Sequence, residues 1–181
     1  AKHLTDEYDG TPVEARIEAI MDQLSEPPVA DLVHFAMHAR WRADGYRNGL
    51  VMPDGEVLEP TELEGIDIEP PAFVFLNACQ AGAADQLLGN YAGLAAAFLR
   101  VGASAVIAPL WAVDDDQAKD VAIGFYERAF AQGEVVADYL RRERASFRQD
   151  CEQLSPTRLG YVFFGHPTMR VHATRAQDAD V

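Results

Sequence analysis

The sequence has few cysteines, few basic residues and no long apolar run, and each shortage excludes a class of protein. The two cysteines, Cys79 and Cys151, do not form the spaced set typical of a disulfide framework, so we expect a reducing compartment and a cytoplasmic protein. The most apolar segment, residues 94–111, is interrupted by Arg100 and Gly102, whereas a membrane span needs about 18 uninterrupted apolar residues. The first ten residues are polar, unlike a secretory signal. We therefore expect no membrane partner.

Positive charge is also scarce. The chain has 15 Lys and Arg against 29 Asp and Glu, which gives a formal net charge of −14. Such a surface repels phosphates, so a nucleic-acid partner is not expected, and basic partners or substrates are favoured. For the total charge alone, the simpler interpretation is a solvated surface that keeps the protein soluble. The sequence also has no metal-ligand spacing and no glycine-rich phosphate loop after its first strand, so we predict no metal and no cofactor.

The 181 residues, 49% of them hydrophobic, suit one domain with a sizeable core. Helical periodicity or caps predict helices over 11–25, 90–102, 114–133 and 135–149, and apolar runs predict strands over 31–38, 72–78, 103–111 and 161–167, with a hairpin over 50–58. This alternation predicts an α/β fold of three layers, in which helices cover both faces of a mainly parallel central sheet. We assign 1–10 to a lead-in, 11–170 to the domain and 171–181 to a flexible tail.

Two chemically useful residues stand at the ends of predicted strands. His38 closes the strand 31–38, and Cys79 follows the strand 72–78. Since the carboxyl ends of parallel strands meet at one rim of a sheet, neighbouring strands would bring the imidazole and the thiol together, as nucleophilic catalysis requires. Small residues around the cysteine, Ala78, Ala81 and Gly82, leave room for a substrate backbone. The alternative is a buried cysteine that only packs.

Several segments of the chain together resemble a known family. They are, in order, "DLVHFAMHA", "NGLVMPDGEVLEPTEL", "AFVFLNACQAG", "GLAAAFLRVGASAVIAPLWAVDDDQA" and "FYERAF". They resemble the CHAT domain, a caspase-like cysteine peptidase domain, and are more distantly similar to separase. The likeness runs from about residue 11 to 167. It implies a caspase-like fold, and an N-terminal strand that is common in the family has no counterpart in residues 1–10.

The resemblance also implies roles for individual residues. His38 and Cys79 would form the catalytic dyad of an endopeptidase, and the backbone N–H groups of Ala39 and Cys79 would bind the oxyanion. Ala39 stands where the family usually has glycine. Alanine keeps the N–H group but tolerates fewer backbone conformations. His34, four residues before His38, is interpreted as structural, and Cys151, His166 and His172 match no motif.

The segment "LWAVDDDQ" bears on substrate choice. By the same resemblance, Trp111 would form an aromatic wall, and Asp115, assisted by Asp114 or Asp116, would pair with a substrate arginine or lysine. A carboxylate can accept two parallel hydrogen bonds from a guanidinium, which favours arginine. The alternative is that the aspartates only cap the following helix. A preference for acidic substrates would instead rely on Arg40 or Arg42.

These observations favour a cysteine endopeptidase that cleaves protein substrates after a basic residue, with arginine preferred. The family likeness further implies control by an activating partner or by an attached domain of a parent chain, and a place in a bacterial defence or regulated-proteolysis system. Two alternatives stay open. The departure at Ala39 motivates a catalytically silent interaction module, and a different thiol hydrolase or a small-ligand domain could use the same fold.

Overall fold

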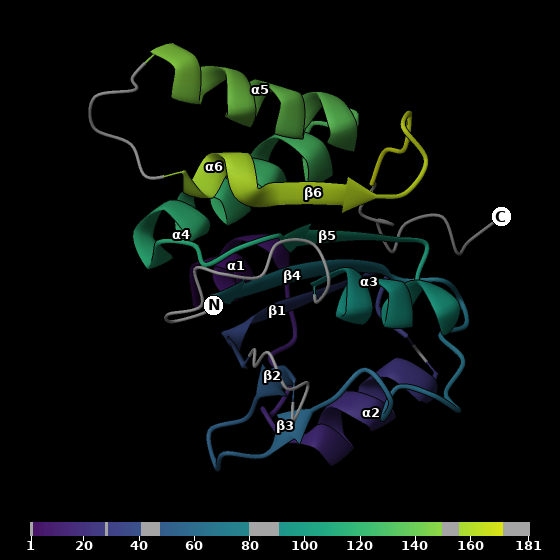
Figure 1. The fold of residues 1–181 in the computed structure, drawn as a ribbon. Helices are drawn as coiled ribbons and strands as arrows, with labels where there is room; N and C mark the ends of the chain where they lie inside the picture. Colours follow the sequence, from purple (N-terminus) through teal and green to yellow (C-terminus); the bar gives the residue numbers. More distant parts are fainter. Residues whose placement is uncertain (1, 28, 41–47, 80–90, 150–155, 172–181) are drawn as a thin grey trace, which may run out of the picture.

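The computed structural model describes residues 2–27, 29–40, 48–79, 91–149 and 156–171. A six-stranded sheet in the order β3-β2-β1-β4-β5-β6 crosses the middle of the molecule (Figure 1). Its strands are β1 (Leu32–Arg40), β2 (Gly49–Val51), β3 (Val57–Leu58), β4 (Phe73–Cys79), β5 (Ala105–Pro109) and β6 (Tyr161–Phe164). The apolar runs and the hairpin predicted from the sequence are therefore confirmed as strands, with boundaries that shift by a few residues.

The sheet is mixed, so the prediction of a mainly parallel sheet is wrong. Strands β1, β4 and β5 run parallel, whereas the pairings β1–β2, β2–β3 and β5–β6 are antiparallel. The connections from β1 to β2 and from β2 to β3 are too short for the crossover of a dozen or more residues that a parallel pair requires. Strand β6 begins opposite the end of β5, with Tyr161 paired to Pro109, because the helices between them return the chain to that end.

One face of the sheet is covered by α2 (Ile17–Ser25) and α3 (Tyr91–Arg100). The side chains buried there are almost entirely aliphatic. The exceptions include Phe35 and Phe98, whose ring centroids are 5.4 Å apart. Helix α2 begins at Ile17, later than the predicted start at residue 11, and its N-cap Arg16 has no side-chain capping bond. The apolar stripe of the sequence correctly marked the packed part of this helix, while Thr11 does not cap it.

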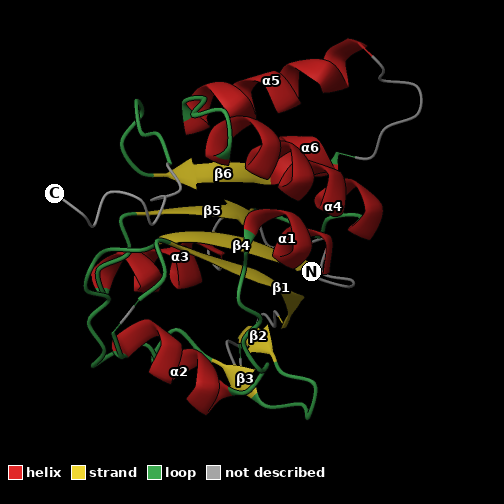
Figure 2. Ribbon diagram, turned by 180° about the vertical axis from the view of Figure 1, so that it is seen from behind, coloured by secondary structure: helices red, strands yellow, loops and turns green. Residues whose placement is uncertain are grey.

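The opposite face is covered by α4 (Asp115–Gly124), the π-helical segment η1 (Phe125–Phe130) and α5 (Val136–Gln149). Helix α1 (Lys2–Tyr8) lies on this side, in front of the sheet in Figure 2, and the Tyr8 ring is 5.0 Å from that of Tyr126. A short helix, α6 (Thr157–Gly160), leads directly into β6. Helices thus flank both faces, as expected. Within the described residues, every helix is too short or too polar to cross a bilayer.

Candidate active site

Strands β1 and β4 are direct neighbours and run parallel, which is the condition that the sequence argument required. Their register pairs His34 with Phe75, Ala36 with Asn77 and, at the carboxyl end, His38 with Cys79. Strand β4 ends at this pair, and β1 continues for two residues beyond it. The fold therefore brings the two residues of the predicted dyad to one rim of the sheet, where the His38 side chain is exposed.

Ala39 lies inside β1 and not after it, because the strand extends to Arg40. There it is the register partner of Leu50 on β2, and Arg40 is the partner of Gly49. Position 39 is thus extended backbone immediately past the last residue pair of β1 and β4. Arg42, the other basic residue considered for acidic substrates, falls outside the described residues.

His34 occupies an aromatic environment and not the rim. Its ring stacks on that of Tyr126 with centroids 5.7 Å apart and lies 4.8 Å from the Phe75 ring. Its Nδ1 atom is 3.2 Å from the Tyr126 hydroxyl, and its Nε2 atom is buried without a hydrogen-bond partner among the described residues. Burial lowers the pKa of His34 to about 4, because the charged imidazolium would lose its hydration. This histidine is neutral at pH 7 and packs as part of the core.

The three aspartates at the start of α4 are not equivalent. Asp114 is the N-cap: its Oδ1 accepts from the backbone N–H of Gln117 at 3.0 Å, and its own N–H donates to Thr157 Oγ1 at 2.8 Å. Asp115 and Asp116 occupy the first turn of the helix with exposed side chains. Asp114 therefore caps the helix, whereas the carboxylates of Asp115 and Asp116 face solvent.

Trp111 follows the end of β5 and is half-buried. A Cβ atom placed on Gly160 would lie 3.0 Å from Cε2 and Nε1 of this indole, so the ring packs directly against the glycine that precedes β6. Its Nε1 is buried without a hydrogen-bond partner in the described part of the chain. Trp111 lies close to the acidic segment in the sequence, and in the fold its ring packs against the end of α6.

Comparison with known families agrees with this geometry. The sequence profile of the CHAT domain matches residues 10–173. The chain belongs to the CHAT family. This confirms the predicted family and its caspase-like α/β fold, and makes the protein a relative of peptidases. No curated protein matches the chain.

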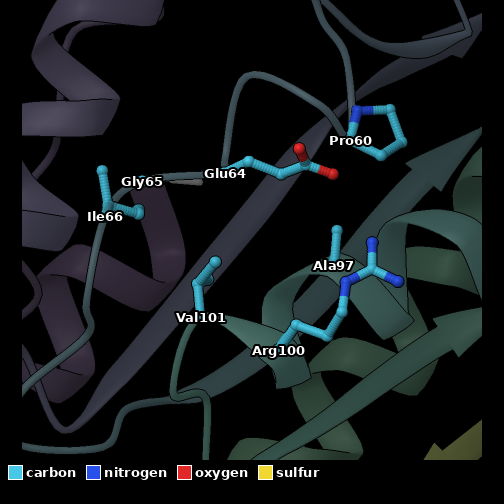
Figure 3. Close-up of a pocket in the computed structure, with 7 residues that line it drawn as sticks. All are labelled: Pro60, Glu64, Gly65, Ile66, Ala97, Arg100 and Val101. Atoms are coloured by element: carbon cyan, nitrogen blue, oxygen red, sulfur yellow. The ribbon is translucent and has the colours of Figure 1, made fainter.

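A pocket of about 290 Å³ in this CHAT domain lies away from the rim that carries Cys79. It is lined by Pro60, Glu64, Gly65, Ile66, Ala97, Arg100 and Val101. Figure 3 shows it at the C-terminal end of α3, which leads back to the start of β5, so it opens near the opposite end of the sheet. It is not part of the candidate active site. Among the described residues, no group of three His, Cys, Asp or Glu side chains could hold a metal ion.

Asn77, which lies inside β4 just before the rim, is not among the site residues predicted from the sequence. It is a polar, half-buried residue inside the otherwise apolar run of β4, two positions before Cys79. Because an amide is costly to bury unless it is hydrogen-bonded, a lone asparagine in such a run is itself a signal of a specific role. Its partners lie on α4 and β6, far away in the sequence, and only the fold reveals them.

Proposed function

We propose that this CHAT domain is a cysteine endopeptidase in which Cys79 is the nucleophile and His38 the general acid and base. The observation that supports this most directly is the register pair His38 and Cys79 on adjacent parallel strands, at the rim where they end. In sheets of this kind, ligands bind beyond the carboxyl ends of the strands. The exposure of the His38 side chain leaves it open to a substrate and to water.

In the proposed reaction the Cys79 thiolate attacks the scissile carbonyl carbon, and the carbonyl electrons move onto oxygen as the C–S bond forms. Backbone N–H groups of Ala39 and Cys79 stabilise that oxyanion. Collapse of the intermediate breaks the C–N bond, and protonated His38 gives its proton to the leaving amine. Water, deprotonated by His38, then hydrolyses the thioester and regenerates the thiolate.

We further propose that the site accepts arginine, and less readily lysine, before the scissile bond. Asp115 and Asp116 support this because they are exposed carboxylates in the first turn of α4, while Asp114 is engaged in capping. Two parallel hydrogen bonds to a guanidinium reward arginine over the point charge of lysine. Trp111 would supply an apolar wall for the substrate side chain.

The family likeness also supports control of this site by a protein partner or by a domain attached to the same parent chain. An activator of that kind would raise the rate of peptide cleavage without changing the preference for arginine. The test is to add the partner, once it is identified, and to compare kcat on arginyl and lysyl peptides. This measures both the increase in rate and the unchanged preference for arginine.

The decisive test is the intact mass of the protein after incubation with an arginyl-peptide electrophile that traps active thiols. We expect one adduct, mapped to Cys79, with none on the Cys79→Ala variant and little from the matching aspartyl probe. An adduct from the aspartyl probe alone would show that the site prefers acidic substrates, which basic residues such as Arg40 would bind. The absence of any adduct at high probe concentration, also in the presence of the activating partner or domain, would contradict the peptidase and favour a silent interaction module.

A further inference from the structure

Asn77 connects three elements that are distant in the sequence. Its Nδ2 donates to the carbonyl oxygen of Ala118 on α4 at 3.1 Å, and its Oδ1 accepts from the hydroxyl of Tyr161 on β6 at 2.6 Å. Each end of the amide thus has a partner of matching polarity. Tyr161 is fully buried and Asn77 is half-buried, so the Tyr161 end of this tie lies inside the packed face of the sheet.

The same stretch of chain that provides Tyr161 also holds the acidic segment. Thr157 Oγ1 accepts from the N–H of Asp114 at 2.8 Å, and the N–H of Leu110 donates to the carbonyl oxygen of Gly160 at 2.9 Å. Residues 157–161 therefore contact both ends of the segment 110–114, while Tyr161 contacts Asn77. These hydrogen bonds form a network, the circuit, that links β4, the strand of Cys79, through β6 to the start of α4.

We infer that Asn77 is a positioning residue, which fixes Asp115 and Asp116 relative to Cys79 and so sets the preference for basic substrates. This inference rests on the proposed function and deepens it. Ala118 lies one helical turn beyond Asp115, so a bond to its carbonyl restrains α4 both along and around its axis. Asn77 is two residues before Cys79 on the same strand, so the restraint acts close to the nucleophile.

The physical reason that such a restraint affects selectivity is geometric. Two parallel hydrogen bonds to a guanidinium require the carboxylate at a defined place and angle. A displacement of about 1 Å in a positioned group can cost up to about a hundredfold in rate. Without Asn77, α4 keeps its apolar packing but loses its directional bond to β4. We therefore expect the discrimination between arginine and its neutral isostere citrulline to fall roughly tenfold to a hundredfold.

The first experiment measures the charge near Cys79 without requiring catalysis. In a Cys151→Ser background, Cys79 is modified with a cationic and with a neutral methanethiosulfonate at low ionic strength, about 0.01 M, where the Debye length is about 30 Å. We define the reagent ratio as the rate of modification by the cationic reagent divided by the rate with the neutral reagent. In the wild type this ratio should favour the cation, and the Asp115→Asn/Asp116→Asn double variant gives the ratio without these carboxylates. We expect Asn77→Ala to lower the ratio toward that of the double variant.

Two further variants separate positioning from general destabilisation. Tyr161→Phe removes one hydroxyl from the circuit, keeps the buried ring and should lower the ratio partly. Val74→Ala lies on the same strand but packs on the other face, so it should reduce stability and leave the ratio unchanged. The same variants are then assayed for kcat/KM on arginyl and citrullinyl peptides.

The outcomes distinguish the two proposals. A folded Asn77→Ala or Tyr161→Phe protein with the wild-type reagent ratio overturns the positioning role, and so does an equal drop in Val74→Ala. A wild-type protein that cleaves neither peptide even with its activating partner or domain, while the reagent ratio still falls in Asn77→Ala, overturns the peptidase and supports the positioning of charge. Loss of both the reagent ratio and the arginine preference supports the whole inference.

Discussion

The two faces of β4 bury different chemistry. On the face toward α2 and α3, the strand contributes Val74, Leu76 and Ala78, all of them fully buried. On the face toward α4 and α5, it contributes Phe75 and Asn77, in the neighbourhood of tyrosine hydroxyls and His34. Cys79 continues the second series in the sequence. The strand thus combines an aliphatic face and a face with directional polar bonds.

The two faces of β4 contribute differently to the stability of the fold and to the positioning of neighbouring elements. Apolar burial is roughly proportional to area and has no preferred direction, so the aliphatic face holds the sheet to its helices without fixing fine geometry. Hydrogen bonds have defined lengths and angles, and buried polar groups left unpaired are costly. The polar face therefore restricts how α4 and β6 sit against β4, next to the candidate nucleophile.

Leu76→Ala should have the largest effect on stability, since this fully buried side chain belongs to the aliphatic face. The lost burial and the cavity left behind should lower the free energy of unfolding by about 2–5 kcal/mol. Urea unfolding at pH 7.5 measures the change. The reagent ratio at Cys79, measured on the folded fraction, should stay at its wild-type value. A change in that ratio would show that the two faces are not independent.

His34 should make the stability depend on pH through the polar face. The unfolded chain binds a proton at this residue near pH 6.5, while the folded protein binds it only near pH 4 because the ring is buried beside Tyr126 and Phe75. The contribution of His34 to the free energy of unfolding is therefore fully present above pH 6.5 and is lost as the pH drops toward 4. Between pH 7.5 and 5 the free energy of unfolding should fall by about 2 kcal/mol.

The His34 prediction is checked by urea unfolding of the wild type and of His34→Phe at several pH values. The difference between their free energies of unfolding should shrink or reverse as the pH falls, because the variant has no proton to bind there. A difference that stays constant from pH 7.5 to 5 would mean that His34 titrates alike in both states.

Tyr139→Phe should have a moderate effect. The hydroxyl of this fully buried residue donates to the carbonyl oxygen of Val121 on α4 at 2.5 Å, and burial raises the pKa of the phenol. Removing the hydroxyl should lower the free energy of unfolding by about 1 kcal/mol, the net value of one such bond. Thermal unfolding measures this loss. A loss as large as that of Leu76→Ala would contradict the division between the two faces.

The smallest effect is expected on the outer surface of α5. Arg141 and Asp138 form an ion pair of 3.3 Å whose side chains are 80% and 54% exposed. Arg141→Ala should change the free energy of unfolding by less than about 0.5 kcal/mol, because water and salt screen such a pair. This variant is the surface reference for the other three in the same unfolding experiments.

Much of the fold was predictable from local patterns. The apolar runs that became β1, β4 and β5 and the Pro-Asp-Gly hairpin of β2 and β3 were read from residue order alone. The direction of β6 was not, because it depends on where four consecutive helical segments return the chain, and no local pattern encodes that. The start of α2 was also misplaced, since Thr11 and Pro12 are good helix-initiating residues that this chain leaves outside its helix.

The candidate site divides in the same way. Residue order alone specifies the chemistry that is available: an imidazole at one strand end, a cysteine at another and three aspartates at the start of a helix. The tertiary structure decided which of these meet, because the register of β1 and β4 pairs His38 with Cys79. It also decided that Asp114 caps α4 and that Asn77 joins β4 to α4 and β6. Such hydrogen bonds depend on atoms brought within about 3 Å by packing between distant segments, which only the folded chain specifies.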